Sequence, residues 1–232
     1  MARITTLIDK RDTFEIIRDE LAAILRVESA AQEALATSAG KDPANWKLRI
    51  FLERSNPWEE FQEPSEVPEG EPLPDVPPIV NVSFENLTFD MNASNTVERQ
   101  KATATYNIDC YGYGVAADNP DGGHIPGDED ASLDCQRAVR LVRNVLMAGA
   151  YTYLGLRGTV WRRFIQSVTM FQPTANEQPV QQVKAARVAL QVEFNEFSPQ
   201  VEGTPLELIS VQVKRDEESG EIFLTATYSG ED

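Results

Sequence analysis

The residues best suited to chemistry gather in one loop, residues 115–130, which has the sequence VAADNPDGGHIPGDED and includes the only histidine of the chain, His124. Carboxylates and an imidazole can form a metal site or a catalytic cleft, or they can make a solvated projection that contacts a partner. Pro120 and Gly122 fall where a calcium-binding loop needs alternating oxygen ligands. A zinc site or a catalytic triad would have only His124 to use. We therefore expect an exposed histidine, and aspartates that solvate the loop and cap a helix.

The two cysteines are the other candidates for chemistry. Cys110 lies in an alternating, strand-like segment and Cys135 in a helix-like one, and the chain has no Cys-x-x-Cys pair. We expect small core residues rather than a redox pair. No glycine-rich phosphate loop of the Walker or dinucleotide type occurs either. The sequence thus favours a protein that is not an enzyme and has no cofactor or metal. A small hydrolase that uses the aspartates of residues 118–130 with a divalent metal stays open as an alternative.

Composition limits the partners. The chain has 232 residues, 41% of them hydrophobic, and a formal net charge of −16. The apolar content is sufficient for a packed core, and the negative charge repels nucleic acid and anionic membranes. No apolar run approaches the length of a membrane span, and residues 1–15 lack the apolar stretch of a signal peptide. We expect no membrane association, a cytoplasmic location, and cysteines that stay reduced.

Periodic patterns predict the elements that position these residues. From residue 12 to about residue 40, a helical apolar face is formed by Phe14, Ile17, Leu21, Ile24 and Leu25. Alternation predicts strands at 46–53, 79–91 and 102–114, and a change of phase at Glu85–Asn86 predicts a bulge in the second of them.

The third of these strands has a polar side. Four polar residues alternate with its apolar ones: Thr103, Thr105, Asn107 and Asp109. That face should be wet or contact another polar surface, because an antiparallel sheet commonly packs only one face on the core.

Residues 59–78 interrupt the strands with six prolines and seven acidic residues. Prolines remove backbone donors and like charges repel, so we expect an extended loop without a core of its own. Long insertions between paired strands raise the free energy of folding only slightly. We expect the flanking strands to belong to one sheet, from which this acidic loop projects.

The second half predicts a helix and four strands. The helix covers residues 130–149, with Asp128 or Asp130 as its N-cap and Gly149 as its stop. Strands are expected at 164–171 and 183–197, and residues 206–228 have the pattern of a β-hairpin that turns through residues 216–220.

The order of these elements predicts an α+β fold: a mainly antiparallel β-sheet with the N-terminal helix and the central helix packed on one face, plus a C-terminal β-hairpin arm. We expect one domain over residues 1–203, which includes the acidic proline-rich loop, and an arm over residues 204–232. The arm could clasp a neighbouring subunit by adding strands to a sheet edge.

Charge and apolar patterns indicate where a subunit or partner would bind. The central helix and the segment after it place positive charge on an acidic protein, at Arg137, Arg140, Arg143, Arg162 and Arg163. The acidic counterparts are Asp118, Asp121 and Asp128, and the arm contributes Ile209, Val211, Ile222 and Leu224. The arginines form either a solvated helix face or a contact with an acidic surface of a neighbour.

The order of elements resembles the tail terminator proteins of long-tailed bacteriophages. The resemblance rests on PPIVNVSFENLTFD, on QKATATYNIDCYGYG as a long strand that ends in a variable loop, on ASLDCQRAVRLVRNVLMAG as the central helix, and on FIQSVTMFQP with VKAARVALQVEF as the closing strand pair. It covers about residues 1–198, and it lies in the layout rather than in any diagnostic residue. The acidic loop and the hairpin depart from a minimal terminator.

The resemblance implies a hexameric ring in the neck of the virion that caps the tail tube, ends tail polymerisation and presents a surface to the head connector. The implied partners are further copies of the chain, the tail tube protein, a connector or neck protein and, in a contractile tail, the sheath protein. DNA would pass through an acidic lumen without specific binding. Assembly would take place in the host cytoplasm. The alternative is another neck or head-completion protein of the head–tail interface.

Overall fold

The computed structural model describes residues 11–61, 76–91, 99–118, 123–175, 178–179, 182–197, 208–214 and 222–229. The chain divides into two compact units, Lys10–Ser198 and a smaller unit of Met1–Asp9 with Pro199–Asp232. The larger unit contains the main sheet and both long helices, and the smaller one contains the C-terminal hairpin. The predicted fold class, α+β with a mainly antiparallel sheet, is confirmed.

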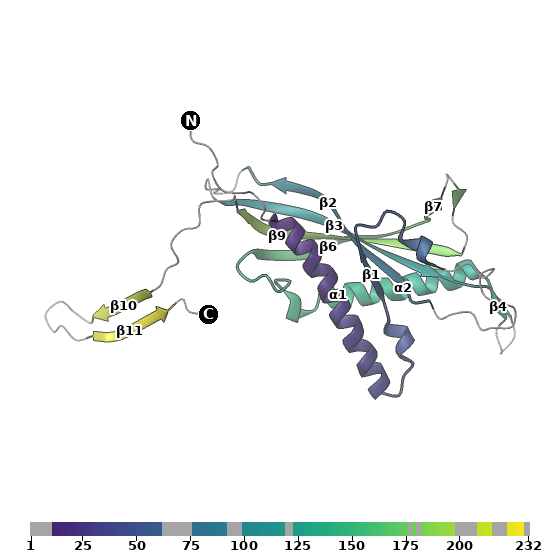
Figure 1. Cartoon of the computed structure of the whole chain (residues 1–232), viewed down its shortest axis with the longest axis horizontal. Helices are drawn as coiled ribbons and strands as arrows, with labels where there is room; N and C mark the ends of the chain where they lie inside the picture. Colours follow the sequence, from purple (N-terminus) through teal and green to yellow (C-terminus); the bar gives the residue numbers. More distant parts are fainter. Residues whose placement is uncertain are drawn as a thin grey trace. The chain divides into compact units, whose positions relative to one another are not determined.

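A five-stranded sheet forms the centre of the larger unit, in the order β1-β2-β3-β9-β6 (Figure 1). Its strands are β1 (Arg49–Leu52), β2 (Ile79–Phe89), β3 (Arg99–Tyr113), β6 (Val160–Phe171) and β9 (Val183–Phe197). All neighbours are antiparallel except β1 and β2, which are parallel. The strands that flank the acidic loop therefore do belong to one sheet, and β1 and β6 are its two edges.

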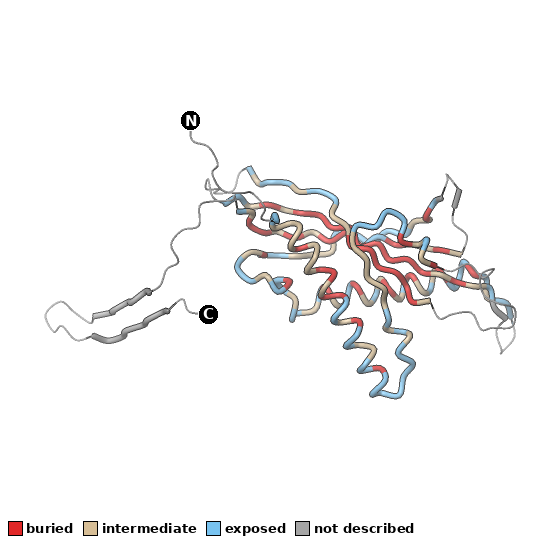
Figure 2. Tube along the Cα trace, in the orientation of Figure 1, coloured by how far each residue is buried: buried red, intermediate tan, exposed pale blue. Residues whose placement is uncertain are grey.

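Two helices cover one face of this sheet, α1 (Thr13–Ser38) and α2 (Gly127–Leu146) (Figure 1). The core lies between them and the alternate residues of the central strands, which carry the buried positions in Figure 2. The strand residues in this core include Val80, Val82, Tyr106, Ile108, Val188, Leu190 and Phe194. The shorter elements are η1 (Pro43–Trp46), η2 (Pro57–Glu60), β4 (Ala117–Asp118), β5 (His124–Ile125), η4 (Gly149–Tyr151), β7 (Thr174–Ala175) and β8 (Gln178–Pro179).

Helix α1 follows the predicted apolar face, and polar contacts fix its first turn. Ile17, Leu21 and Leu25 are buried against the sheet. The Thr13 amide donates to both carboxylate oxygens of Glu196 in β9, at 3.1 Å each. A carboxylate at this position also suits the positive end of the helix dipole. The helix thus begins where β9 ends.

Helix α2 lies directly on the end of β3 because two glycines let the backbones approach. A Cβ at Gly112 would lie 2.3 Å from the Ala131 carbonyl oxygen, and one at Gly114 would lie 2.2 Å from the Ala131 amide nitrogen. The predicted N-cap is wrong: Pro126 occupies the cap, and Asp128 and Asp130 lie in the first turn. There the helix dipole favours their charge without a capping hydrogen bond. The predicted stop is also slightly late, because the C-cap is Met147.

The strand predicted at 46–53 is shorter than expected. Residues 43–46 form η1, since Pro43 suits a helical first position and the Asp42 carboxylate accepts a hydrogen bond from the Ala44 amide at 3.0 Å. Only Arg49–Leu52 form β1. In β2, by contrast, the predicted bulge is confirmed by a register shift between Phe84 and Asn86.

The structure describes both ends of the predicted acidic loop, residues 59–78. Residues 57–60 form η2, so the expectation of an extended loop is wrong for Glu59 and Glu60. Phe61 and Val76 pack with Tyr111 in a second apolar cluster, on the face of the sheet away from the helices. Residues 62–75 lie outside the described residues.

The polar side of β3 is not wet, which corrects that part of the prediction. Thr105, Asn107 and Asp109 are only 6%, 7% and 4% exposed. Asp109 accepts hydrogen bonds from Arg187 Nε at 2.7 Å and Nη2 at 2.8 Å, so the side chain from β9 covers and neutralises it. Arg187 thus closes this face over Asp109 within the subunit, whereas Asn107 Oδ1 is buried without a hydrogen-bond partner among the described residues.

The smaller unit contains one two-stranded antiparallel sheet in its described residues, β10 (Leu208–Lys214) and β11 (Ile222–Ser229). The register pairs Ile209 with Tyr228 and Val211 with Ala226. The predicted turn at 216–220 lies outside the described residues.

Candidate assembly interface

The predicted arginines divide into two groups. Arg137 pairs with Asp134 one helical turn before it and donates to Asn45 Oδ1 at 2.9 Å. Arg163 donates to the Ala148 carbonyl at 2.6 Å, just beyond the end of α2, and burial lowers the pKa of its guanidinium. These two arginines bind groups of their own subunit.

The other three arginines face solvent. Arg140 and Arg143 are exposed on α2. Arg162 is exposed at the start of β6, where its guanidinium pairs with Glu193 at 2.9 Å and lies 5.2 Å from the centre of the Phe164 ring. Arg140 and Arg143 present their charges to solvent, whereas Arg162 also pairs within its own subunit, in an exposed pair that contributes little stability by itself.

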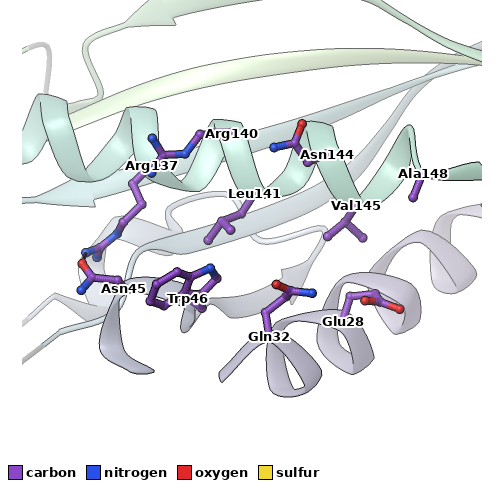
Figure 3. A pocket seen from close by; sticks show the side chains of 10 residues that line it. All are labelled: Glu28, Gln32, Asn45, Trp46, Arg137, Arg140, Leu141, Asn144, Val145 and Ala148. Carbon is purple, nitrogen blue, oxygen red and sulfur yellow. Dashed lines mark hydrogen bonds between the residues drawn. The ribbon is translucent and has the colours of Figure 1, made fainter. Parts of the chain in front are cut away.

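A groove runs between α1 and α2 on the surface of the helix layer (Figure 3). Its volume is about 550 Å³. Trp46, Leu141 and Val145 supply apolar contacts, while Arg137 reaches across to Asn45 and Arg140 lies beside it (Figure 3). The remaining lining residues are Glu28, Gln32, Asn144 and Ala148. The groove therefore combines apolar, acidic and basic side chains, and one of its two arginines, Arg137, already binds groups of its own subunit.

The structure describes two of the three predicted aspartates. Asp128 is exposed in the first turn of α2. Asp118 lies in β4, where the register pairs it with His124 of β5, and Asp121 lies outside the described residues. His124 is exposed, as predicted. Within the described ranges, no group of three or more histidine, cysteine, aspartate or glutamate residues is placed to hold a metal ion.

The cysteines are core residues, as predicted. Cys110 and Cys135 are fully buried and free, and Cys135 Sγ donates to the Cys110 carbonyl at 3.3 Å. Burial raises the pKa of the Cys135 thiol to about 12, with a smaller contribution from the nearby Asp134 carboxylate. Burial also raises the pKa of Cys110. Both thiols therefore stay protonated at neutral pH, which makes them poor nucleophiles.

Strand β6 supplies an interface feature that sequence reasoning did not identify. It pairs with β9 on one side, and no described strand pairs with its other side. Trp161, Val168 and Met170 are 51%, 46% and 46% exposed on it. The alternation of residues 164–171 predicted a strand, but a local pattern does not state where a strand lies in its sheet.

The register of the hairpin places three of its four predicted interface residues in one row. Ile209 and Val211 pair with Tyr228 and Ala226, and Val213 pairs with Leu224. Ile222 pairs with Lys214, beyond a register shift, so the bulge separates it from that row. Leu224 is therefore the last of the four residues before the register shift.

No model of a known protein family matches the sequence, and no curated protein sequence matches it either. Of the helices that the structure describes, none is both long and apolar enough to cross a membrane.

Proposed function

We propose that this chain is a structural subunit of a bacteriophage tail, a tail terminator that forms a six-membered ring on the end of the tail tube. The observation that carries the proposal is the long edge strand β6, beyond which no described strand lies. A sheet edge presents unpaired backbone donors and acceptors, and proteins either guard such an edge or use it to assemble.

Two further features support assembly over catalysis. The element order resembles that of tail terminators, with a helix, three strands, a central helix and closing strands. A hairpin in a compact unit of its own suits an arm that contacts another subunit. Among the described residues that could do chemistry, Cys110 and Cys135 are buried, and His124 and Asp128 are exposed.

The charge of the chain suits a ring through which DNA passes. A net charge of −16 per copy is multiplied six times in such a ring. An acidic lumen repels the phosphate backbone, so DNA would slide without binding. One face of the ring would contact the tail tube protein and the other a connector or neck protein. The protein would be assembled in the host cytoplasm and end in the neck of the virion.

The experiment is a deletion of the gene, followed by electron microscopy of the tails. A missing terminator gives tails of abnormal length that do not join heads. A missing head-side neck protein gives tails of normal length, with heads that leak DNA or fail to attach. Normal-length tails in the deletion mutant would replace the terminator proposal with the neck protein.

A further inference from the structure

The β6 edge contains one regular segment that is open to a partner. Register shifts interrupt its pairing with β9 between Val160 and Arg162 and between Ile165 and Ser167. Residues 167–171, SVTMF, then pair without interruption and contain no charge and no proline. No hydrogen bond from a described residue outside β9 reaches the backbone of these five residues. The segment thus lacks the features that usually blunt an edge strand.

Apolar side chains accompany this open backbone. Val168 pairs with Val188 and Met170 pairs with Ala186, and paired residues of neighbouring strands share a face. Val188 and Ala186 belong to the buried core under the helices, whereas Val168 and Met170 are each 46% exposed. The apolar row of the core therefore continues onto the edge strand and stays half uncovered. A further strand beside β6 would satisfy the backbone and cover this row together.

The hairpin β10–β11 would in turn be stabilised by pairing with a further strand. An isolated two-stranded hairpin is marginally stable in water and gains stability when it joins further strands. Strand β11, IFLTATYS, carries no charged residue, like the segment 167–171, whereas β10 ends in Lys214. A lysine on an edge disfavours pairing, so β11 is the better donor.

Charge complementarity favours the same contact. The segment between β10 and β11 includes DEESGE at residues 216–221, with four carboxylates. An arginine stands at the start of β6: Arg162 is 66% exposed and pairs with Glu193 at 2.9 Å. If β11 runs parallel to β6, the acidic segment that precedes β11 in the chain would lie toward Arg162.

We propose that β11 of a second copy of this chain pairs with residues 167–171 of β6, extends the sheet between subunits and covers Val168 and Met170. The inference rests on the proposed ring, because it assigns the contact that joins one subunit to the next. A donor strand and an acceptor strand that are different segments of the chain make a head-to-tail contact, which closes into a ring when the rotation permits.

Cross-linking between two single-cysteine variants tests this contact. Thr169→Cys places a thiol on the acceptor and Thr225→Cys places one on the donor, and the native cysteines are fully buried and will not react. The two full-length variants are mixed at micromolar concentration, free and with purified tails, and treated with a short bismaleimide. We expect a covalent dimer from the mixture and none from either variant alone.

Each other outcome overturns the inference. A dimer from Thr169→Cys alone indicates that β6 pairs with β6. Cross-linking only within a chain that carries both substitutions indicates that the hairpin binds its own subunit. Rings without any cross-link leave the proposed function in place and remove this contact, whereas the absence of both rings and cross-links removes both proposals.

A matched pair of lysine substitutions provides the second readout. In the Thr169→Cys background, Val168→Lys should reduce the yield of the mixed dimer by about tenfold or more, because it places a charge on the row that β11 covers. Val27→Lys, at a 63% exposed valine of α1, should leave the yield unchanged. Melting temperatures verify that both variants fold. Equal yields for the two lysine variants would contradict the assignment of the edge.

Discussion

Strands β1 and β6 end the same sheet on opposite sides, and their backbones have different surroundings. On β1, only four residues pair, and Arg26 Nη2 donates to the Ile50 carbonyl at 3.3 Å. Glu53 then leaves the strand with φ of 51°, and its carboxylate accepts the Phe84 amide at 2.9 Å, in place of a further ladder bond. On β6, twelve residues form the strand, and no described side chain caps the far edge of its last five.

One sheet can therefore serve stability at one edge and assembly at the other. The Arg26 side chain from α1 occupies the Ile50 carbonyl of β1, and the Glu53 carboxylate occupies the Phe84 amide of β2 just past the end of β1, so this edge offers little to another chain. The long edge keeps free backbone groups beside half-exposed apolar residues, which is the combination that strand addition uses. Substitutions at β1 should therefore change the free energy of unfolding, and substitutions at the end of β6 should change association.

The largest effect on the closed edge is expected from Ser29→Ala. The Ser29 hydroxyl donates to the Trp46 carbonyl and accepts the Leu48 amide, both at 3.0 Å, and the side chain is 6% exposed. Its loss leaves both backbone groups unpaired near α1, so the free energy of unfolding should fall by about 1–3 kcal/mol. Urea denaturation measures the change.

The matched control for this substitution is Ser38→Ala. Ser38 is exposed and its hydroxyl donates to the Ala34 carbonyl within the same helix. The expected change is within about 0.5 kcal/mol. Equal losses for the two variants would show that the Ser29 bridge does not hold η1 and β1 against α1.

A smaller effect is expected from Glu53→Ala, at the residue that ends β1. The carboxylate accepts the Phe84 amide and pairs with Arg18 at 3.3 Å, but the side chain is 42% exposed, so solvent weakens both contacts. We expect a loss of about 0.5–1 kcal/mol in the free energy of unfolding, and a smaller loss for Glu53→Gln, which keeps an oxygen for Phe84. If Glu53→Gln is as destabilising as Glu53→Ala, the hydrogen bond to β2 is not the important contact.

The smallest effect is expected from Arg26→Ala. The bond to Ile50 is long and exposed, so its loss should change the free energy of unfolding by less than about 0.5 kcal/mol. Four paired residues make a poor template for another strand, so mass photometry should show no new association. New oligomers in Arg26→Ala would show that this arginine blocks association at β1. The β1 edge could then pair with another strand as readily as β6, which contradicts the proposed difference between the two edges.

Much of the fold can be predicted from local sequence patterns, but the strands that form the edges of the sheet cannot. A change in the phase of the alternating pattern predicted the bulge near Asn86. Alternation on both sides of a polar turn predicted the hairpin. The parallel pairing of β1 with β2 could not be derived, because strand order across a sheet depends on contacts between distant segments. For the same reason, the sequence could not predict that no described strand pairs with the outer edge of β6.

The candidate interface was predicted only in part, for a related reason. The sequence placed Arg137, Arg140 and Arg143 correctly on the central helix, whereas Arg162 and Arg163 lie in β6, which begins before the strand predicted at 164–171. Which of them bind their own subunit depends on partners far along the chain, such as Asn45 for Arg137. The burial of Asp109 likewise depends on Arg187, which is 78 positions away, and an alternating pattern contains no sign of that pair.

The central claim is that this chain assembles into a closed ring that caps a tube. To test it, the mass of the full-length protein is measured by mass photometry at micromolar concentration, and the protein is imaged by electron microscopy with purified tails. The account predicts a closed ring of six chains, either free in solution or on the end of the tail tube. A single chain at every concentration, together with bare tail ends after mixing, would contradict it.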